Sequence, residues 1–600
     1  MISLLIRDSP FRYTANVKLV IALLLAISAA PAQPPAPAAP DTLFIHGNIL
    51  TGAHLKPSDA SPTAARVTAI AVTDGTITAI GSDAEIVKLK SPKTKVIDLH
   101  GAFAMPGFND AHTHMGNAGR QQLAIDLTGV RSLAEMQQRI RNSATTPPGT
   151  WLLGGGWDHT LWPGAKLPAR ADIDAVTGGH PAIFRRVDEH MAIANSAALA
   201  AAGISAATPD PPGAKIDRDG SGNPTGVLRE AAASNLVFAK VPPPTPQQRE
   251  QAVTVAMEDA LAHGVTSVQD NSDWEDFLAW ETLERTGKLH LRVAEWLEFT
   301  QPLAVLEGHR SSHPTDDPFL HITMLKGFMD GSLGSRTAAL AKPYTDDPGN
   351  SGIPRYDQKT LNSMTIERAA AGFQIGFHAI GDRANTMALD AFTSWMSKIH
   401  APCRPQPHPK LPAPARPTDP CGVPYPSPRL RIEHAQVLLP TDFDRFAQLS
   451  VIASMQPSHL LTDMNWAAAR LGPDRVKYSY AWHSMLSHHI PLAFGTDYPV
   501  ESINPFRGLY AAVTRQNEAG TAAYQPQERI SLLEAIYAYT QTSAFAEFRE
   551  HLKGRLEPGF LADFIVLDRD ITAPATTTQQ LLHTHVLRTI VNGETVYTAP

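Results

Sequence analysis

The sequence is poor in charged residues and has no basic excess. Charged residues make up 18% of the 600 residues, and the formal net charge is -7 with a pI near 6.4. A protein that binds nucleic acid through the phosphate backbone needs a basic surface, so this composition argues against a nucleic-acid partner. Hydrophobic residues make up 43% of the chain, which is enough to bury a large core. The length fits one barrel with an accessory domain better than a string of small modules.

The apolar run near the start of the sequence is too short to cross a membrane comfortably. It covers residues 19–30, whereas a spanning helix needs about 20 apolar residues. Basic residues precede the run, and small residues that a signal peptidase accepts follow it. This order predicts a secretory signal peptide over residues 1–32 and a Pro/Ala linker over residues 33–40. We therefore expect a periplasmic or secreted protein without stable membrane insertion after cleavage; an uncleaved anchor is the alternative.

Cysteine is nearly absent. The two cysteines, Cys403 and Cys421, both lie in a Pro-rich loop at residues 402–428. Export would place this long loop in an oxidising compartment, where a disulfide persists. We expect a Cys403–Cys421 disulfide, which would contribute about 3 kcal/mol in the chain-entropy model. Two unlinked thiols are the alternative, because the sequence does not show that the side chains approach each other.

Short β-rich segments occur on both sides of a long middle section. Each group is too small to be stable alone, so the two groups are expected to pair. We predict one β-sandwich domain built from residues 41–103 and 556–600. The segments are 42–45, 67–72, 76–80, 562–567, 587–591 and 595–597.

Eight apolar runs alternate with helix-length stretches in the middle section. This alternation is typical of βα units, and eight of them predict an α/β fold with a closed (β/α)8 barrel over residues 104–555. The interval after the first run is too long for one crossover, so residues 116–262 are expected to contain an inserted subdomain. The runs are 104–108, 266–269, 289–294, 322–328, 374–377, 430–433, 451–455 and 491–494, and helices are expected at 247–263, 361–372 and 384–399.

Residues able to bind metal stand at the ends of several predicted strands, where a barrel has its active site. His112 and His114 are two residues apart in an extended segment, so both rings point to one side and can share an ion. Lys326 lies inside an apolar strand, where an unpaired ammonium is costly to bury. Each residue alone has an ordinary structural explanation, but six at consistent strand ends predict a metal site. The six are His112, His114, Lys326, His378, His434 and Asp497.

Six motifs surround these positions. They are MPGFNDAHTH at 105–114, GGWD at 155–158, DGS at 330–332, HAIGD at 378–382, EHA at 433–435 and GTDYP at 495–499. Together they resemble the amidohydrolase superfamily, and within it the family-3 branch that includes N-substituted formamide deformylases and uncharacterised metal-dependent hydrolases. The resemblance covers nearly the whole chain after residue 40.

The resemblance implies a metal centre. His112 and His114 with Asp497 would hold one divalent ion, and His378 and His434 would hold a second. Lys326 would bridge the two as a carbamate formed with carbon dioxide. Imidazole and carboxylate donors suit one or two zinc ions, while manganese, iron or cobalt and a one-metal site stay open. The metal would activate water and polarise a carbonyl, and Asp497 would act as general base and pass the proton to the leaving nitrogen.

Four further residues are expected to contact the substrate. The resemblance implies that the insert covers the barrel mouth with Trp157 and His190 facing the substrate, although Glu189 stands where the family usually has glycine. Asp330 and Arg336 follow the fourth predicted strand and are expected to hold polar ends of the ligand. A solvated surface ion pair is the alternative for these two.

The expected function is hydrolysis of an amide or formamide C–N bond in a small molecule. Esters, carbamates and cyclic amides have the same polarised carbonyl and stay open. A serine hydrolase with Ser332 as nucleophile and His378 as base is disfavoured, because no Gly-x-Ser-x-Gly elbow surrounds Ser332. A binding protein without turnover is disfavoured because the full set of ligand types is present. Relatives of this kind often form homodimers, and the sequence leaves the assembly open.

Overall fold

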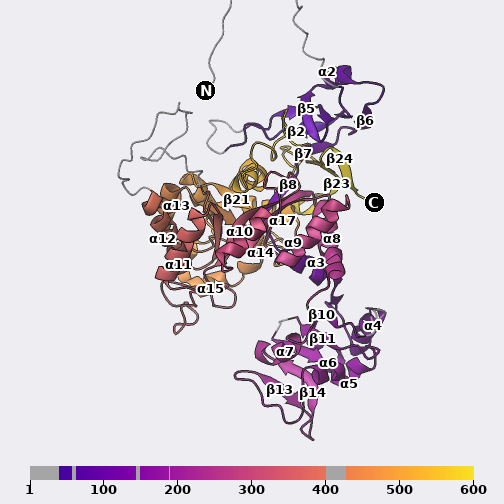
Figure 1. Ribbon diagram of the computed structural model, residues 1–600, viewed down its shortest axis with the longest axis vertical. Helices are drawn as coiled ribbons and strands as arrows, with labels where there is room; N and C mark the ends of the chain where they lie inside the picture. Colours follow the sequence, from indigo (N-terminus) through magenta and orange to yellow (C-terminus); the bar gives the residue numbers. More distant parts are fainter. Residues whose placement is uncertain (1–38, 57–62, 144–148, 188–189, 400–427) are drawn as a thin grey trace, which may run out of the picture.

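The computed structural model describes residues 39–56, 63–143, 149–187, 190–399 and 428–600. The predicted signal peptide, most of the predicted linker and both cysteines lie outside these ranges. No helix within the described ranges has the length and apolar character needed to cross a bilayer. Figure 1 shows a central barrel with β sheets from both ends of the sequence on one side and an inserted lobe on the other.

The centre of the molecule is a nearly closed barrel of eight parallel strands. Neighbouring strands pair in sequence order from the first to the last. Beyond the eighth strand, the seam is bridged where the Asp497 N–H donates to the His112 carbonyl and the His114 N–H donates to the Tyr498 carbonyl, both at 2.8 Å. The seam therefore brings Asp497 beside both histidines. The strands are β8 (Phe108–Thr113), β15 (Val265–Asp270), β16 (Arg292–Glu298), β17 (Leu320–Phe328), β18 (Gln374–Ala379), β19 (Arg431–His434), β20 (Ile452–Met455) and β21 (Leu492–Phe494).

The first barrel strand lies later in the sequence than the apolar pattern predicts. Of residues 104–108 only Phe108 belongs to it, because β7 (Phe103–Pro106) lies in a sheet outside the barrel. The barrel strand begins at Phe108, after a single intervening glycine. A Cβ at Gly107 would lie 2.3 Å from the Thr266 side chain, so only glycine fits at this join.

Buried polar residues explain why the sequence pattern misplaces this strand. Asn109 and Asp110 are buried within β8, although their polarity is typical of a loop. The Asp110 carboxylate accepts hydrogen bonds from the Thr496 N–H at 2.9 Å, the Thr496 hydroxyl at 2.6 Å and the His112 N–H at 3.1 Å. These bonds satisfy the carboxylate, so a polar strand is tolerated in the core.

Helices surround the barrel, and the three helices predicted from sequence are present as α8, α11 and α12. Helix α8 starts where the Thr245 side chain accepts a hydrogen bond from the Gln248 N–H and Pro246 occupies the first turn. The helices used below are α3 (Met115–Leu123), α8 (Pro246–Ala262), α9 (Trp274–Arg285), α10 (Leu303–Ser311), α11 (Gln358–Ala370), α12 (Asp382–Ile399) and α14 (His459–Asp463).

Two small sheets pack above the barrel and combine strands from both ends of the sequence. In one of them β7 pairs with β22 antiparallel and with β2 parallel. The two sheets share one core, in which the Phe44 and Phe564 rings meet edge to face at 4.9 Å. One sheet contains β1 (Thr42–Ile45), β4 (Ala69–Thr73), β5 (Thr76–Gly81) and β6 (Lys95–Asp98); the other contains β2 (Asn48–Leu50), β3 (Arg66–Val67), β7, β22 (Phe564–Leu567), β23 (Val586–Val591) and β24 (Glu594–Thr598).

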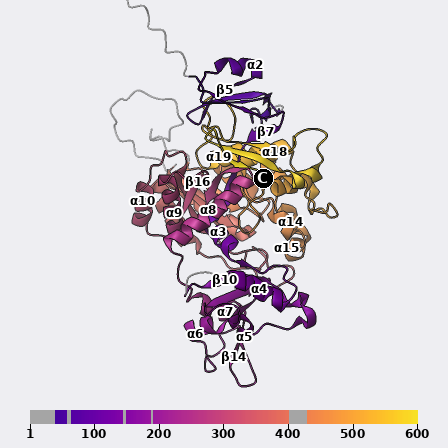
Figure 2. The same ribbon diagram turned by 90° about the vertical axis from the view of Figure 1, so that its right-hand side faces the viewer.

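The insert between β8 and β15 forms a separate lobe. It projects from the barrel below α3 in both views (Figures 1 and 2). Helix α3 itself packs against α8 on the barrel, and a Cβ at Gly119 would lie 1.8 Å from the Ala252 carbonyl oxygen. The lobe therefore begins after α3. Its sheet contains β9 (Ile125–Asp126), β10 (Leu152–Trp157), β11 (Ala182–Arg186), β12 (Met191–Ala194), β13 (Lys215–Arg218) and β14 (Pro224–Arg229), with α4 (Leu133–Ser143), α5 (Arg170–Asp174), α6 (Ser196–Ala201) and α7 (Ala231–Phe238).

A buried ion pair joins the barrel to the sheets above it. Arg292 in β16 contacts the Asp563 carboxylate through two nitrogens, at 2.5 and 2.9 Å. Replacing Arg292 by alanine is expected to lower the free energy of unfolding by about 3–5 kcal/mol, because the Asp563 carboxylate stays buried without its cation. Urea unfolding followed by circular dichroism measures the change.

Arg569→Ala is the matched control for this prediction. Arg569 pairs with Asp568 at 2.8 Å where both side chains are partly exposed, so its loss is expected to cost about 1 kcal/mol or less. Equal effects in the two variants would show that the buried pair does not hold the barrel to the sheets.

Candidate active site

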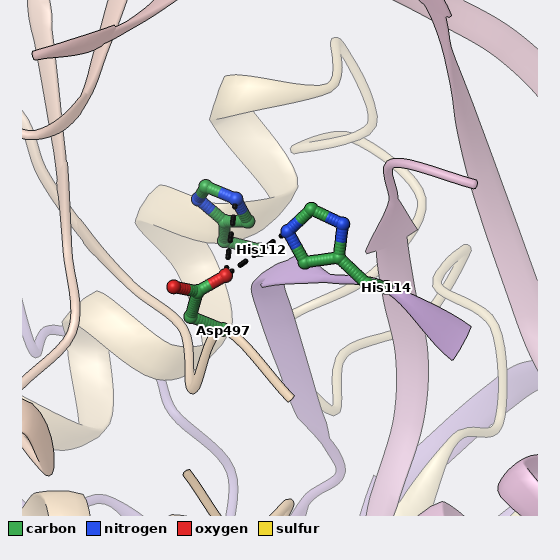
Figure 3. A group of neighbouring side chains, drawn as sticks. All are labelled: His112, His114 and Asp497. Carbon is green, nitrogen blue, oxygen red and sulfur yellow. Dashed lines mark ion pairs between the residues drawn. The ribbon is translucent and has the colours of Figure 1, made fainter. Parts of the chain in front are cut away.

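Three of the predicted ligands meet at the mouth of the barrel. The Nε2 atoms of His114 and His112 lie 3.1 and 3.5 Å from Oδ1 of Asp497. Figure 3 shows both rings directed at this one carboxylate. His112 lies in β8, His114 follows it, and Asp497 follows β21, so the barrel seam assembles the group. One donor atom from each residue lies within 4.8 Å of the others, which is a spacing that a single ion can bridge.

The outer nitrogens of the two histidines face acceptors. His114 Nδ1 lies 2.9 Å from the Asn271 carbonyl oxygen, and His112 Nδ1 lies 3.0 Å from Oε2 of Glu433. A proton on each Nδ1 would leave the Nε2 atoms free to bind a metal ion. Burial lowers the pKa of His112 well below its ordinary value, as does the nearby Lys326. His112 is therefore neutral, which is the form that binds metal.

Glu433 is held in place by a buried arginine. The Arg431 Nε donates to Oε1 of Glu433 at 2.9 Å, and another guanidinium nitrogen donates to the Ala111 carbonyl at 3.0 Å. Arg431, Glu433 and His112 are all fully buried. Glu433 stands next to His434 in one of the motifs, but the sequence alone does not predict its contact with His112.

Replacing Glu433 by glutamine is expected to weaken divalent-metal binding by about 10–100-fold, because His112 loses the carboxylate that orients its ring. Competition with a chromophoric chelator measures the affinity. Glu518→Gln, a change at an exposed carboxylate that pairs with Arg507 at 2.7 Å, is the control. Parent-like affinity in the Glu433→Gln variant would show that His112 is positioned by other contacts.

Lys326 lies inside β17 beside the same group. Its Nζ is 2.8 Å from Nε2 of His112 and lies over the rings of Trp296 and Phe328. Burial lowers the pKa of Lys326 to about 8. The neutral amine, which is the form that reacts with carbon dioxide, is therefore more populated near neutral pH than in an exposed lysine.

The second predicted group, His378 with His434, is only partly formed in the structure. The rings of His378 and His434 lie 4.5 Å apart. His378 Nε2, however, lies 3.2 Å from the Gly331 carbonyl oxygen. The second group with metal-binding spacing contains His434, Asp497 and His459.

Sequence reasoning missed His459. Its Nε2 lies 3.6 Å from Oδ2 of Asp497, on the opposite side of the carboxylate from His112 and His114. His459 begins α14, four residues after the seventh barrel strand ends at Met455. That place near a strand end was the available signal, although His459 does not directly follow the strand as the predicted ligands do.

Two buried histidine nitrogens without hydrogen-bond partners indicate that the residues around Asp497 fit a metal ion. Nδ1 of His434 and Nε2 of His459 are buried and have no hydrogen-bond partner among the described residues. A buried polar atom without a partner is destabilising, and a metal ion would satisfy a neutral imidazole nitrogen. The donors are the imidazoles of His112, His114, His434 and His459 around the Asp497 carboxylate. This set of donors suits zinc and related divalent ions.

The two substrate contacts predicted in the insert, Trp157 and His190, both lie on the lobe. Trp157 is 0% exposed and lies in the core of the lobe, where its indole N–H donates to the Phe184 carbonyl at 2.9 Å. The large ring fills the lobe instead of facing a ligand. His190 lies on the lobe with its side chain largely exposed, and its Nδ1 is 2.9 Å from Glu230.

Asp330 and Arg336 have structural partners. The buried Asp330 carboxylate accepts hydrogen bonds from the N–H groups of Ala339 and Gly381, both at 2.8 Å, and burial raises the pKa of Asp330 to about 7. Arg336 donates to the Asp346 carboxylate at 3.2 and 2.9 Å. The Arg336–Asp346 contact matches the alternative of a solvated ion pair. Asp330 is fully buried with backbone partners, so a solvated ion pair does not describe it.

The serine-hydrolase alternative finds no support in this geometry. The Ser332 hydroxyl oxygen lies 2.7 Å from the hydroxyl oxygen of Ser335. His378 Nε2 is directed at the Gly331 carbonyl oxygen. A nucleophile and base would instead need a hydrogen bond between serine and histidine.

Comparisons with known proteins relate the chain to one family and to several relatives. The model of the amidohydrolase family matches residues 95–597. Protein LONG AFTER FAR-RED 3 of Arabidopsis thaliana is 34% identical over 585 residues, which cover 94% of this chain and 93% of that protein. N-substituted formamide deformylase of Arthrobacter pascens is 26% identical over 574 residues, with 92% and 97% covered. The crystal structure of an uncharacterized metal-dependent hydrolase from Pyrococcus horikoshii OT3 aligns with a TM-score of 0.70 and 28% identity, over 90% of this chain and 99% of that one.

Proposed function

This chain belongs to the amidohydrolase family, and we propose that it hydrolyses an amide or formamide C–N bond of a small molecule. The observation that carries the proposal is Asp497, whose Oδ1 faces His112 and His114 while its Oδ2 faces His459. Similarity to N-substituted formamide deformylase supports a C–N bond as the target. Esters, carbamates and cyclic amides are the second class of substrate, because they offer the same carbonyl.

The residues at the mouth would hold one or two divalent ions, of which zinc suits the donors best. His112, His114 and Asp497 would hold one, and His434 with His378 or His459 would hold the other. Lys326, carbamylated by carbon dioxide, would supply an anionic oxygen between them. A bound divalent ion supplies a Lewis acid that makes water more acidic and polarises a carbonyl.

Asp497 has the protonation state that a general base needs. Burial alone would raise its pKa, but the hydrogen bond with His114 opposes burial, and the pKa of Asp497 lies well below the ordinary value. The carboxylate is therefore ionised and can accept a proton at an oxygen. In the proposed reaction Asp497 takes the proton from the attacking water and passes it to the departing nitrogen.

The export of the protein is a separate proposal. It is supported by the basic and apolar order of residues 1–32 and by the cysteine pair, Cys403 and Cys421, in the Pro-rich loop. Mass spectrometry of the protein from culture medium or periplasm, before and after reduction, tests both the cleavage and the disulfide. A homodimer is also proposed, and light scattering of the purified protein tests it.

A matched hydrolysis screen tests the function. The purified protein, loaded with a divalent metal, is assayed on N-formyl and N-acetyl amines and on the corresponding formate and acetate esters, carbamates and cyclic amides. Release of free amine from formyl or acetyl amines at a higher kcat/KM than release of alcohol from the esters is expected. Turnover confined to the esters would overturn the assignment to C–N bonds, and no turnover of any carbonyl substrate would overturn hydrolysis.

A further inference from the structure

A second group of metal-type donors lies at the opposite end of the barrel from Asp497. Glu284 stands in the last turn of α9, and His313 and Asp317 lie in the segment between α10 and β17. One donor atom from each residue lies within 4.8 Å of the others. Helix α9 follows β15 and leads back to the start of β16, so this group lies at the amino ends of the strands. The active site of a barrel enzyme lies at the carboxyl ends, so the two groups are separate.

The His313 ring is buried, and the nitrogen that faces this group has no partner. Its side chain is 7% exposed, and the Phe277 ring meets it edge to face at 5.5 Å. Nε2 is buried without a hydrogen-bond partner among the described residues. It lies 3.9 Å from Oε2 of Glu284, which is too far for a hydrogen bond. Two donors that each lie about 2.1 Å from one ion are about 3–4 Å apart, so the spacing fits a shared ion.

Glu281 holds the His313 ring in a metal-binding orientation. Nδ1 of His313 lies 3.0 Å from Oε1 of Glu281, one turn of α9 before Glu284. A proton on Nδ1 that is donated to this carboxylate leaves Nε2 free to bind a metal ion. Histidine ligands in proteins almost always donate their other ring N–H to an acceptor of this kind. Glu281 therefore supports the imidazole of this group as Glu433 supports His112 at the barrel mouth.

The two carboxylates of the group lie close together without a basic partner. Oδ1 of Asp317 accepts hydrogen bonds from the N–H groups of Phe319 at 2.7 Å and Leu320 at 3.1 Å, which fix the carboxylate. Burial raises the pKa of Glu284, and the negative charge of Asp317 raises it further. Within the described ranges, neither carboxylate forms an ion pair with a lysine or arginine. A cation between the two carboxylates would remove their repulsion.

The ends of two helices add to the negative potential at this place. Glu281 and Glu284 stand in the last turn of α9, where the helix dipole disfavours acidic residues and favours cations. Helix α10 ends at Ser311, two residues before His313. A bound cation would therefore offset unfavourable electrostatics from the carboxylates and from both helix ends.

We propose that Glu284, His313 and Asp317 bind a divalent transition-metal ion that ties the end of α9 to the segment before β17. The imidazole donor favours an ion such as zinc over calcium or magnesium, which prefer oxygen ligands alone. Three protein donors leave a coordination position for water. The ion is structural, because the group lies at the end of the barrel opposite the proposed catalytic residues.

Metal content tests the site directly. The full-length protein is equilibrated with buffered free zinc and analysed for zinc per chain. The parent is expected to hold one more zinc ion than either His313→Ala or the isosteric variant Glu284→Gln. His551→Ala is the control, because the His551 ring is 87% exposed and lies 3.7 Å from Glu550; it is expected to hold as much zinc as the parent. Equal zinc content in the parent and in both site variants would overturn the proposal.

Thermal unfolding with and without zinc separates metal binding from an ordinary structural role. In chelator, Glu284→Gln is expected to unfold at the same temperature as the parent or above it, because the variant removes the repulsion between Glu284 and Asp317. Zinc is expected to raise the midpoint of the variant by about 1–4 °C less than that of the parent. Both proteins keep the residues around Asp497, so zinc at the barrel mouth cancels in this comparison. An equal zinc-dependent rise in the two proteins would contradict the site.

Calcium tests the role of the imidazole. The same unfolding comparison is made with calcium at the free concentration used for zinc. The difference between the parent and Glu284→Gln is expected with zinc and not with calcium, since calcium gains little from a nitrogen donor. A difference of the same size with calcium would rule out His313 as a ligand and overturn the proposed transition-metal site.

Discussion

Replacing Asp497 by asparagine is expected to lower kcat/KM by about 10²–10⁴-fold. The amide has nearly the same shape as the carboxylate but does not accept a proton, so the variant removes the base and leaves the packing at the barrel seam intact. The backbone N–H of residue 497 can still donate to the His112 carbonyl. Steady-state kinetics on the best substrate of the hydrolysis screen measures the loss, and elemental analysis measures the metal content in the same preparation.

Asp474→Asn is the matched control for this variant. Asp474 is exposed and pairs with Lys477 at 3.5 Å, so parent-like activity is expected. Parent-like kcat/KM in the Asp497→Asn variant, with metal retained, would remove Asp497 as the base. Loss of metal together with activity would instead show that the carboxylate serves mainly as a ligand.

Removal of metal is expected to lower activity by at least about 10³-fold, because a Lewis acid contributes several kcal/mol of transition-state stabilisation and each 1.4 kcal/mol is a factor of ten. Dialysis against a chelator followed by kinetics measures the effect, and circular dichroism checks that the fold persists. Added zinc is expected to restore activity. If Lys326 acts as a carbamate, recovery is faster with bicarbonate than in buffer freed of carbon dioxide. A metal-free preparation with full activity would contradict the whole assignment.

A group outside the barrel mouth needs its own control in this experiment. Glu284, His313 and Asp317 also have donor atoms within 4.8 Å of one another, and they lie on α9 and in the segment before β17. Metal bound there would add to the measured stoichiometry. His313→Ala is expected to leave activity unchanged, whatever it does to the total metal content.

The barrel could be predicted from the sequence because its strands bury apolar side chains in runs. Seven of the eight predicted runs overlap the barrel strand expected there. Residues 289–294, for example, begin three residues before β16 and overlap its start. The eighth prediction failed at β8, where Asn109 and Asp110 are buried by hydrogen bonds to partners far along the chain. Apolar periodicity does not report a strand whose burial depends on such partners.

The candidate site was predictable to the extent that its residues lie at strand ends. His112, His114 and Asp497 were found in this way, and the structure brings them together. Glu433 has the same kind of position, but the sequence does not show that its carboxylate turns toward His112, which lies in a distant strand. Trp157 was misplaced because a motif tryptophan has the same sequence signal whether it faces a ligand or fills a core.

The pairing of β7 with β22 has a consequence for how the chain assembles. Strand β7 leads through Gly107 directly into the first barrel strand, while β22 leaves the ribosome long after the other barrel strands have been made. One edge of β7 therefore stays open until synthesis has passed residue 567, so a nascent chain stalled before that point exposes an aggregation-prone strand edge next to the first barrel strand.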